Sequence, residues 1–281
     1  MVGITAPPAH QIELDGAENV RDIGGYPTLS GMRIRQETVY RGDALNELSH
    51  SDVKRLSRLG LKSVIDLRSD EEWEINGPDI LPAAVEVHRV PIRLGDVAAF
   101  YALIDGGDTE AQREALGPGR AEQVMLAMYR GFVTERLHRI QFGEAFRLLA
   151  DENNLPALVH STAGSDRVGW FFAVVMSVLG VQRDLIVRDY LISNDMHQHS
   201  YELLYRGLAD SGRMKEPFLL RPVLRQSQEY LRAGFEATER RYNGVSQYIR
   251  NGFDLDDGRI LKLRQLLLEP DPGQMRPRLV K

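Results

Sequence analysis

The sequence predicts an α/β fold in which a central, mostly parallel sheet is flanked by helices on both faces. Short apolar segments with the length of strands alternate with longer amphipathic segments over the first two-thirds of the chain. Later segments show only helical patterns, so residues 195–269 are expected to form a helical part. With 281 residues, 43% of them hydrophobic, the chain can bury one sizeable core. We therefore expect a single domain over residues 1–269 and a proline-containing tail over residues 270–281.

Four segments have the character of strands. Residues 62–68 (Lys-Ser-Val-Ile-Asp-Leu-Arg) and 156–160 (Pro-Ala-Leu-Val-His) are short apolar runs typical of buried strands. Residues 37–41 and 85–92 predict two further strands, the second with a proline near its far end. Residues 19–25 end in a glycine pair and are expected to form a turn.

Helices are expected where apolar residues recur at helical spacing. Val53, Leu56 and Leu59 show this spacing. Ser49 before them favours a helix N-cap, and Gly60 after them favours a C-cap. The other expected helices span residues 121–132, 137–150, 168–179, 181–194, 200–211, 223–242, 245–252 and 257–269, with a single turn at 71–75.

A glycine-rich, charged segment over residues 98–120 interrupts the alternation of strands and helices. Long segments without secondary structure are uncommon in compact domains, so we expect an insertion or lid that is partly helical. Together with the interspersed aromatic residues, such a lid would suit a covered pocket for an aromatic acid or ester.

The charge and the hydrophobic pattern of the sequence argue against binding to nucleic acid and against a membrane span. The formal net charge is −5 and the lysines and arginines are scattered, so we expect no nucleic-acid binding. The sequence has no run of about 18 apolar residues, so we expect no membrane span. Residues 1–10 lack a basic flank followed by an apolar stretch, so no secretory signal is expected and the default location is cytoplasmic. Nothing in the sequence indicates the oligomeric state.

The chain contains no cysteine. This excludes disulfides, thiolate metal sites and thiol nucleophiles. His197 and His199 lie two residues apart near the end of an expected helix, where they would face different sides. We therefore expect no metal and no cofactor.

The segment from His160 to Trp170 (His-Ser-Thr-Ala-Gly-Ser-Asp-Arg-Val-Gly-Trp) joins an expected strand to an expected buried helix. Gly164 and its small neighbours allow the backbone to curl, so that successive N–H groups face inward near the positive end of the helix dipole. Arg167 adds a planar fork that matches two oxygens of a phosphate or carboxylate. An ordinary strand-to-helix turn is the alternative. The expected anion-binding residues are Ser161, Thr162, Ala163, Gly164, Ser165 and Arg167.

This segment resembles the signature of cysteine-based tyrosine and dual-specificity phosphatases, His-Cys-x5-Arg-Thr/Ser. It is most similar to the bacterial atypical tyrosine/serine phosphatases, whose loop reads His-Cys-x-Ala-Gly-Lys-Asp-Arg-Thr-Gly. The resemblance extends along most of the chain and implies a tyrosine-phosphatase-like fold. The other matching segments are residues 19–25, 39–43, 64–68, 129–133, 188–194, 228–231 and 242–244.

Three positions depart from that pattern. Ser161 stands where the family has its nucleophilic cysteine, and a serine hydroxyl needs an adjacent general base. The resemblance implies that His160 instead supports the loop from behind. Ser165 replaces a lysine, and Val168 replaces the residue whose hydroxyl assists release of the thiolate. Three losses together favour natural repurposing over an engineered change of cysteine to serine.

Asp166 matches the position proposed for the catalytic acid in the similar bacterial enzymes, and it remains available for proton transfer. The alternative for Asp166 is a carboxylate that stabilises the start of the helix. His88 and Arg93 lie near a strand end where related phosphatases have their acid loop, although a solvated loop is the alternative. Tyr129 and Arg130 match a family segment that could face the pocket, or they could be core and surface neighbours.

Three functions are consistent with these residues. The favoured one is an enzyme that keeps the anion pocket for a small carboxylate or phosphate substrate and performs proton-transfer chemistry of the lyase type. In that hypothesis Asp166, with His88, moves protons. The second is a pseudophosphatase that binds phosphorylated ligands without turnover. The third is a phosphatase in which serine has replaced the nucleophile, for which Ser161→Cys would restore activity.

Overall fold

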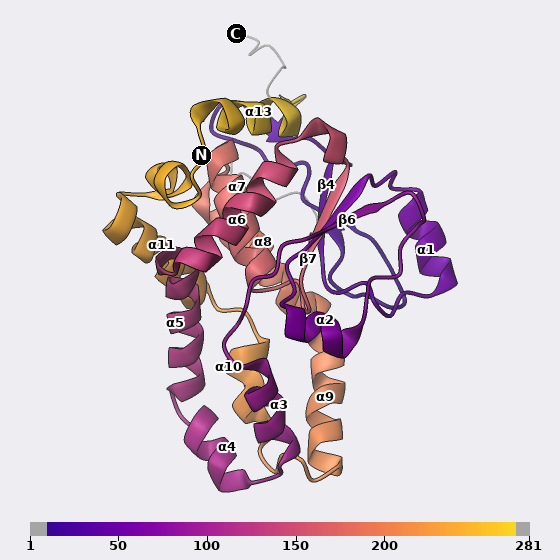
Figure 1. The fold of residues 1–281 in the computed structure, drawn as a ribbon, viewed down its shortest axis with the longest axis vertical. Coiled ribbons are helices and arrows are strands. Elements are labelled where there is room, and N and C mark those ends of the chain that lie inside the picture. The colour runs from indigo at the N-terminus through magenta and orange to yellow at the C-terminus, as the bar shows by residue number, and fades with distance from the viewer. Residues whose placement is uncertain (1–9, 274–281) are drawn as a thin grey trace, which may run out of the picture.

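The computed structural model describes residues 10–273 and confirms the predicted α/β class (Figure 1). A six-stranded sheet has the order β1-β2-β4-β7-β5-β6, and a separate two-stranded sheet pairs β3 with β8. The strands are β1 (His10–Gln11), β2 (Arg21–Asp22), β3 (Met32–Ile34), β4 (Val39–Gly42), β5 (Ser63–Asp66), β6 (Glu86–Arg89), β7 (Ala157–His160) and β8 (Leu268–Pro270).

Helices make up most of the remaining structure. Among the described residues, no helix is both long enough and apolar enough to cross a membrane. The helices are α1 (His50–Ser57), α2 (Asp70–Asn76), α3 (Val97–Asp105), α4 (Thr109–Leu116), α5 (Arg120–Thr134), α6 (Arg136–Leu149), η1 (Glu152–Asn154), α7 (Arg167–Leu179), α8 (Arg183–Met196), α9 (Gln198–Asp210), η2 (Pro217–Leu220), α10 (Arg221–Leu224), α11 (Gln228–Tyr242), α12 (Val245–Gln247), η3 (Tyr248–Gly252) and α13 (Asp257–Leu267).

The four neighbouring strands β4, β7, β5 and β6 are parallel, so their carboxyl ends lie on one side of the sheet. His160, the last residue of β7, pairs with Gly42 on one side and with Asp66 on the other. Ligands of open α/β sheets bind beyond this edge. The 161–167 loop therefore starts where the fold class places binding sites.

Side chains of the central strands alternate between two apolar layers, as the period of a strand requires. Ile65 and Val159 face the large core with α5, α6, α7 and α11. Val64 and Leu158 face a smaller core with Leu56 of α1. The sheet is thus covered on both faces, as predicted.

A third apolar cluster connects the insertion to the helical part. It joins Ile104 of α3 and Leu116 of α4 to Leu208 of α9 and Leu220 of η2. Gln112 is buried in this cluster and donates to the carbonyls of Leu103, Ile104 and Arg213. Figure 1 shows α3, α4, α9 and α10 gathered at the end of the molecule opposite α13. Residues 98–120 are therefore helical and packed, in line with the expectation of a partly helical insertion.

Two expected helices differ in the structure. Residues 223–242 do not form one helix, because α10 ends at Leu224 and Ser227 caps the start of α11 through the N–H of Glu229. The last expected helix ends at Leu267, and residues 268–270 instead pair with β3. Pro270, where the expected tail begins, pairs with Met32 at the end of β8, and residues 274–281 of that tail lie outside the described part.

Candidate functional site

The 161–167 loop points three successive carbonyl groups away from its centre. Each carbonyl accepts a hydrogen bond from outside the loop, and the donors come from three separate parts of the chain. The N–H of Ala44 donates to Thr162 (3.1 Å), Asn19 Nδ2 and His197 Nε2 donate to Ala163 (2.9 and 2.8 Å), and Arg41 Nη2 donates to Gly164 (2.9 Å).

Gly164 allows the sharp curl of this loop. Its φ of +66° lies in the left-handed region, where side chains with a Cβ are strained. A Cβ at this position would also lie 2.2 Å from the carbonyl oxygen of Gly42. Close backbone approach and backbone conformation therefore both require glycine here, as the sequence indicated.

The backbone N–H groups of residues 162–167 have no hydrogen-bond acceptor within residues 10–273. They precede or begin α7, whose first N–H groups lack intrahelical partners. Because the neighbouring carbonyls are held outward, these N–H groups remain available on the inner side of the loop. Such an arrangement of amides at a helix N-terminus is suited to bind an anion.

The Arg167 side chain is 3% exposed, and its Nη atoms have hydrogen-bond partners whereas its Nε does not. Nη2 donates to Glu72 Oε1 at 2.6 Å, and Nη1 donates to Glu72 Oε2 and to the carbonyls of Leu67 and Ile92. Nε is buried and has no partner among the described residues. The edge formed by Nε and Nη2 is thus the side of the guanidinium that Glu72 does not occupy.

Glu72 was missed from the sequence, where residues 71–75 were expected to form a single helical turn. It also accepts from Thr162 Oγ1 at 2.6 Å and from the N–H of Ser69 at 2.8 Å. Burial raises the pKa of Glu72, but the hydrogen bonds and charge of Arg167 outweigh it and hold this pKa at about 2. The Ser69-x-x-Glu72 spacing of a capping box was the available signal.

Asp166 lies within the loop, directly before α7, and its side chain is surrounded by aromatic residues. Its Oδ1 accepts from the Tyr129 hydroxyl at 2.8 Å and from Gln226 Nε2 at 3.2 Å. The Tyr129 hydroxyl is also 2.7 Å from the Tyr190 hydroxyl. Burial raises the pKa of Asp166 more than these hydrogen bonds and Arg167 lower it. The carboxyl group therefore keeps its proton to higher pH than an exposed aspartate does.

Ser161 is buried, and its hydroxyl has no hydrogen-bond partner within the described chain. His160 precedes it but directs Nε2 to Asp79 Oδ2 at 2.9 Å. No general base therefore contacts the Ser161 hydroxyl, so the structure provides no activated serine of the kind found in hydrolases.

His160, Asp66 and Asp79 could each offer one metal ligand, and the three atoms lie within 4.8 Å of one another. Arg68, however, donates to both carboxylates, at 2.9 Å to each from Nη2. Burial lowers the pKa of His160, but its hydrogen bond to Asp79 and the nearby carboxylates raise it overall. The negative charge of this cluster is thus balanced by protein cations, which favours a structural ion network.

The loop is also connected to α8 by buried charges. Arg41, which holds the Gly164 carbonyl, pairs with Asp189 at 2.5 Å, and Arg21 Nε lies 3.4 Å from the same carboxylate. Burial and the nearby Arg41 lower the pKa of Arg21 to about 10. Burial raises the pKa of Asp189, but the two arginines outweigh it and lower this pKa overall.

The remaining predicted residues do not lie at the loop. His88 is on the edge strand β6, where its Nδ1 lies 3.8 Å from Glu86 Oε1. Arg93 is exposed and pairs with Glu71 at 2.5 Å, and Arg130 is exposed on α5. Of the predicted residues outside the loop, Tyr129 is the one that contacts Asp166.

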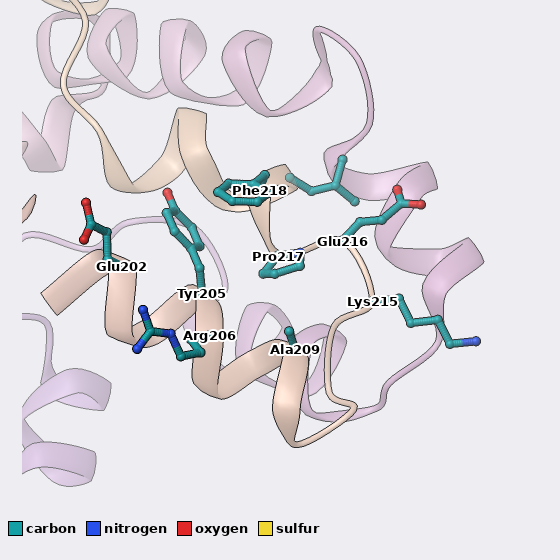
Figure 2. Close-up of a pocket in the computed structure, with 9 residues that line it drawn as sticks. Glu202, Tyr205, Arg206, Ala209, Lys215, Glu216, Pro217 and Phe218 are labelled. Atoms are coloured by element: carbon teal, nitrogen blue, oxygen red, sulfur yellow. The ribbon is translucent and has the colours of Figure 1, made fainter. Parts of the chain in front are cut away.

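A surface hollow of about 840 Å³ lies between α9 and η2. Figure 2 shows Tyr205 and Phe218 beside each other at its wall, with their ring centroids 5.0 Å apart. None of the residues that line this hollow belongs to the 161–167 loop. The hollow is therefore separate from the chemistry described above.

A model of the tyrosine phosphatase family matches residues 12–269. This chain belongs to that family. The triple specificity protein phosphatase PtpB of Mycobacterium tuberculosis is 29% identical over 282 residues, covering 91% of this chain and 98% of PtpB. A protein of Cupriavidus necator described as a candidate tyrosine-protein phosphatase is 28% identical over 251 residues, covering 88% of this chain and 85% of that protein.

Among solved structures, P. aeruginosa TpbA aligns over 57% of this chain and 72% of its own, with 19% identity and a TM-score of 0.28. Membership of the tyrosine phosphatase family is compatible with the loop geometry, but this member has no cysteine in its 281 residues.

We predict that Glu72→Gln strongly destabilises the protein, because it leaves the buried Arg167 charge without its carboxylate. Removal of one partner from a buried pair costs about 3–5 kcal/mol. Glu71→Gln is the matched control, since the exposed Glu71–Arg93 pair should be worth about 0–1 kcal/mol. Urea unfolding of both variants tests this. Equal free energies of unfolding would contradict the role assigned to Glu72.

We predict that Asp166→Asn raises the melting temperature at neutral pH. The pKa of Asp166 is raised above its ordinary value of 3.8, so the native state loses stability as the pH rises from that value through the raised pKa. Asparagine is neutral, and its Oδ1 can still accept from Tyr129. The gain should be a few degrees at pH 7–8, about 2–4 °C for each 1 kcal/mol, and should vanish toward pH 4. A gap that widens on acidification would refute the raised pKa.

Proposed function

We propose that this chain is an enzyme that binds a phosphate or carboxylate group in the 161–167 loop and uses Asp166 to transfer a proton. In this proposal the substrate is a small anionic molecule, and the reaction is an elimination, a decarboxylation or a carbon–carbon cleavage. No phospho-enzyme forms. The carrying observation is the combination of unpaired loop amides with the open edge of Arg167 beside an aspartate of raised pKa.

The anion-binding part of the proposal rests on hydrogen-bond donors that have no acceptor among the described residues. The amides of residues 162–167 and the Nε edge of Arg167 present donors without acceptors in a buried site. Glu72 balances the charge of the arginine and binds its two Nη atoms. An oxyanion would satisfy the remaining donors.

The proposal excludes a phospho-enzyme because Ser161, and not a cysteine, stands at the nucleophile position. Covalent phosphoryl transfer needs a group with substantial nucleophilicity at neutral pH, which a thiolate has and a serine hydroxyl lacks without a base. Ser161 has no base in contact, since His160 is engaged with Asp79. Ser161 is accordingly assigned to anion binding in this proposal.

Proton transfer is assigned to Asp166 alone. The raised pKa brings its carboxyl group closer to the working pH, where a general acid or base is most effective. Tyr129 and Gln226 both bind Oδ1, which orients the group and leaves Oδ2 without a partner among the described residues. His88 lies on the edge strand and is left out of the proposed machinery.

Binding of a phosphorylated ligand without turnover is the second candidate. It shares the loop and Arg167, and it is favoured by the lack of a base at Ser161. Relatives of this chain carry the name of protein phosphatases, which supports a phosphorylated ligand. The two candidates differ in one respect: Asp166 transfers a proton in the enzyme and does not do so in a protein that only binds its ligand.

We predict that Arg167→Lys weakens the binding of inorganic phosphate at least about tenfold, because lysine keeps the charge but lacks the planar fork. Arg130→Lys is the matched control, because Arg130 is exposed on α5. Isothermal titration calorimetry of the purified protein measures both. Unchanged phosphate affinity in Arg167→Lys would refute the proposed anion site.

A further inference from the structure

The Tyr129 hydroxyl lies between two oxygen atoms but has one proton to donate. Its oxygen is 2.8 Å from Asp166 Oδ1 and 2.7 Å from the hydroxyl oxygen of Tyr190 in α8. The rings of the two tyrosines meet edge to face, with their centroids 6.1 Å apart. The Tyr190 ring also packs against α7, where a Cβ at Gly169 would lie 2.8 Å from Tyr190 Cδ2. Packing against α5 and α7 therefore fixes the Tyr190 hydroxyl beside that of Tyr129.

The partners of each hydroxyl determine where its proton points. Burial and the charge of Asp166 raise the pKa of Tyr129 and of Tyr190, so both tyrosines keep their protons at neutral pH. An ionised Asp166 can only accept, so Tyr129 donates to it. The Tyr129 oxygen then has lone pairs left, and Tyr190 donates to it. The chain of hydroxyl groups thus runs from Tyr190 through Tyr129 to Asp166.

The chain keeps this direction when Asp166 takes up a proton. In the reverse direction Tyr129 would donate to Tyr190, and the Tyr190 proton would need another acceptor. The Tyr190 hydroxyl has no hydrogen-bond partner other than Tyr129 within residues 10–273. A buried donor without an acceptor costs free energy, which disfavours the reversal. Asp166 Oδ1 therefore accepts from Tyr129 and from Gln226 in both protonation states.

The proton that Asp166 gains or loses is left to its other oxygen. No hydrogen bond joins Oδ2 to any residue of the described chain. Asp166 is partly exposed, and Oδ2 is not one of the buried side-chain atoms that lack a partner. Oδ2 is therefore the accessible oxygen of this carboxyl group.

We propose that Tyr190 is a positioning residue that fixes the direction of the hydroxyl chain, so that Asp166 transfers its proton through Oδ2. As an acid, Asp166 gives the Oδ2 proton to the substrate and becomes a carboxylate. As a base, the carboxylate takes up a substrate proton on Oδ2. No proton moves along the two tyrosines. This inference rests on the proposed function, because the transfer requires a substrate beside Asp166.

Other titratable groups near Asp166 lie outside the hydroxyl chain. They are Arg167 in α7, Tyr201 in α9 and Tyr230 in α11. Within the described chain, no hydrogen bond joins Tyr201 or Tyr230 to the Asp166 carboxylate. The Tyr230 ring centroid is 5.9 Å from that of Tyr129, but its hydroxyl donates to a backbone carbonyl at 3.0 Å. Tyr230 is therefore a matched control, since it is a buried tyrosine at the same place with a different hydrogen bond.

The pKa of Asp166 in the ligand-free chain tests the direction of the hydroxyl chain. Carbon NMR titration of its carboxyl resonance measures this pKa, and Asp166→Asn identifies the resonance. A Tyr190 hydroxyl that donates to Tyr129 strengthens the bond from Tyr129 to the ionised carboxylate, so Tyr190→Phe should raise the pKa and lower the acid dissociation constant about twofold. Tyr129→Phe removes that bond itself and should lower the constant about tenfold. Tyr230→Phe should leave it unchanged.

The sign of the change separates the alternatives. A lower pKa of Asp166 in Tyr190→Phe would overturn the inference, because Tyr190 would then accept from Tyr129 and stabilise the protonated carboxyl group. An unchanged pKa would also overturn it, since Tyr190 would then contribute packing alone. If Tyr190→Phe does not fold, Tyr129→Phe decides, and no rise in the pKa there would contradict the chain. Absence of phosphate binding by the native chain would refute the proposed function and leave the measured direction of the hydroxyl chain in place.

Discussion

The bidentate pair between Arg167 and Glu72 is the interaction on which the candidate site depends. It joins the start of α7 to α2, and Glu72 also binds Thr162 within the loop. A buried guanidinium without this carboxylate would carry an unpaired charge, which is strongly unfavourable. Because Glu72 binds the two Nη atoms of the guanidinium, Nε is the nitrogen left without a partner among the described residues. The pair stabilises the fold, and in the proposed function it also orients Arg167 toward an anion.

In the backbone of the loop, the carbonyl groups of residues 162–164 have hydrogen-bond donors, whereas the N–H groups of residues 162–167 have no acceptor among the described residues. Its carbonyls are bound by Ala44, Asn19, His197 and Arg41, so the N–H groups face the other way. Asp189 supports this from behind by pairing with Arg41. The loop thus combines outward carbonyls and unpaired N–H groups with the absence of a thiol nucleophile. The proposed change of chemistry rests on this combination.

Much of this could be predicted from the sequence because the signals were local. The apolar runs at 62–68 and 156–160 and the glycine-dependent turn at Gly164 depend on neighbouring residues, and the structure places them as strands and a tight loop. Strands β1, β3 and β8 could not be predicted, since each has two or three residues and exists only through pairing with distant segments. The apolar residues of 223–242 keep helical spacing throughout, so the pattern did not reveal that α10 ends at Leu224 and that Ser227 caps a new helix.

The site was predictable in its loop and less so in its partners. Asp166 and Arg167 follow from the motif, whereas Glu72 and Gln226 reach them from distant parts of the chain through tertiary contacts. His88 was expected at the site because β6 ends near it, but His88 contacts Glu86 along the edge strand, and the carbonyl of Ile92 approaches Arg167 instead. Strand order alone does not determine which side chain of a segment faces the pocket.

Steady-state hydrolysis of p-nitrophenyl phosphate by the native chain tests the central claim most directly. The account predicts no turnover above the uncatalysed rate at neutral pH, because Ser161 has no base and no thiolate replaces it. Sustained turnover that is lost in Ser161→Ala would contradict the account, since it would show that this serine forms a phospho-enzyme.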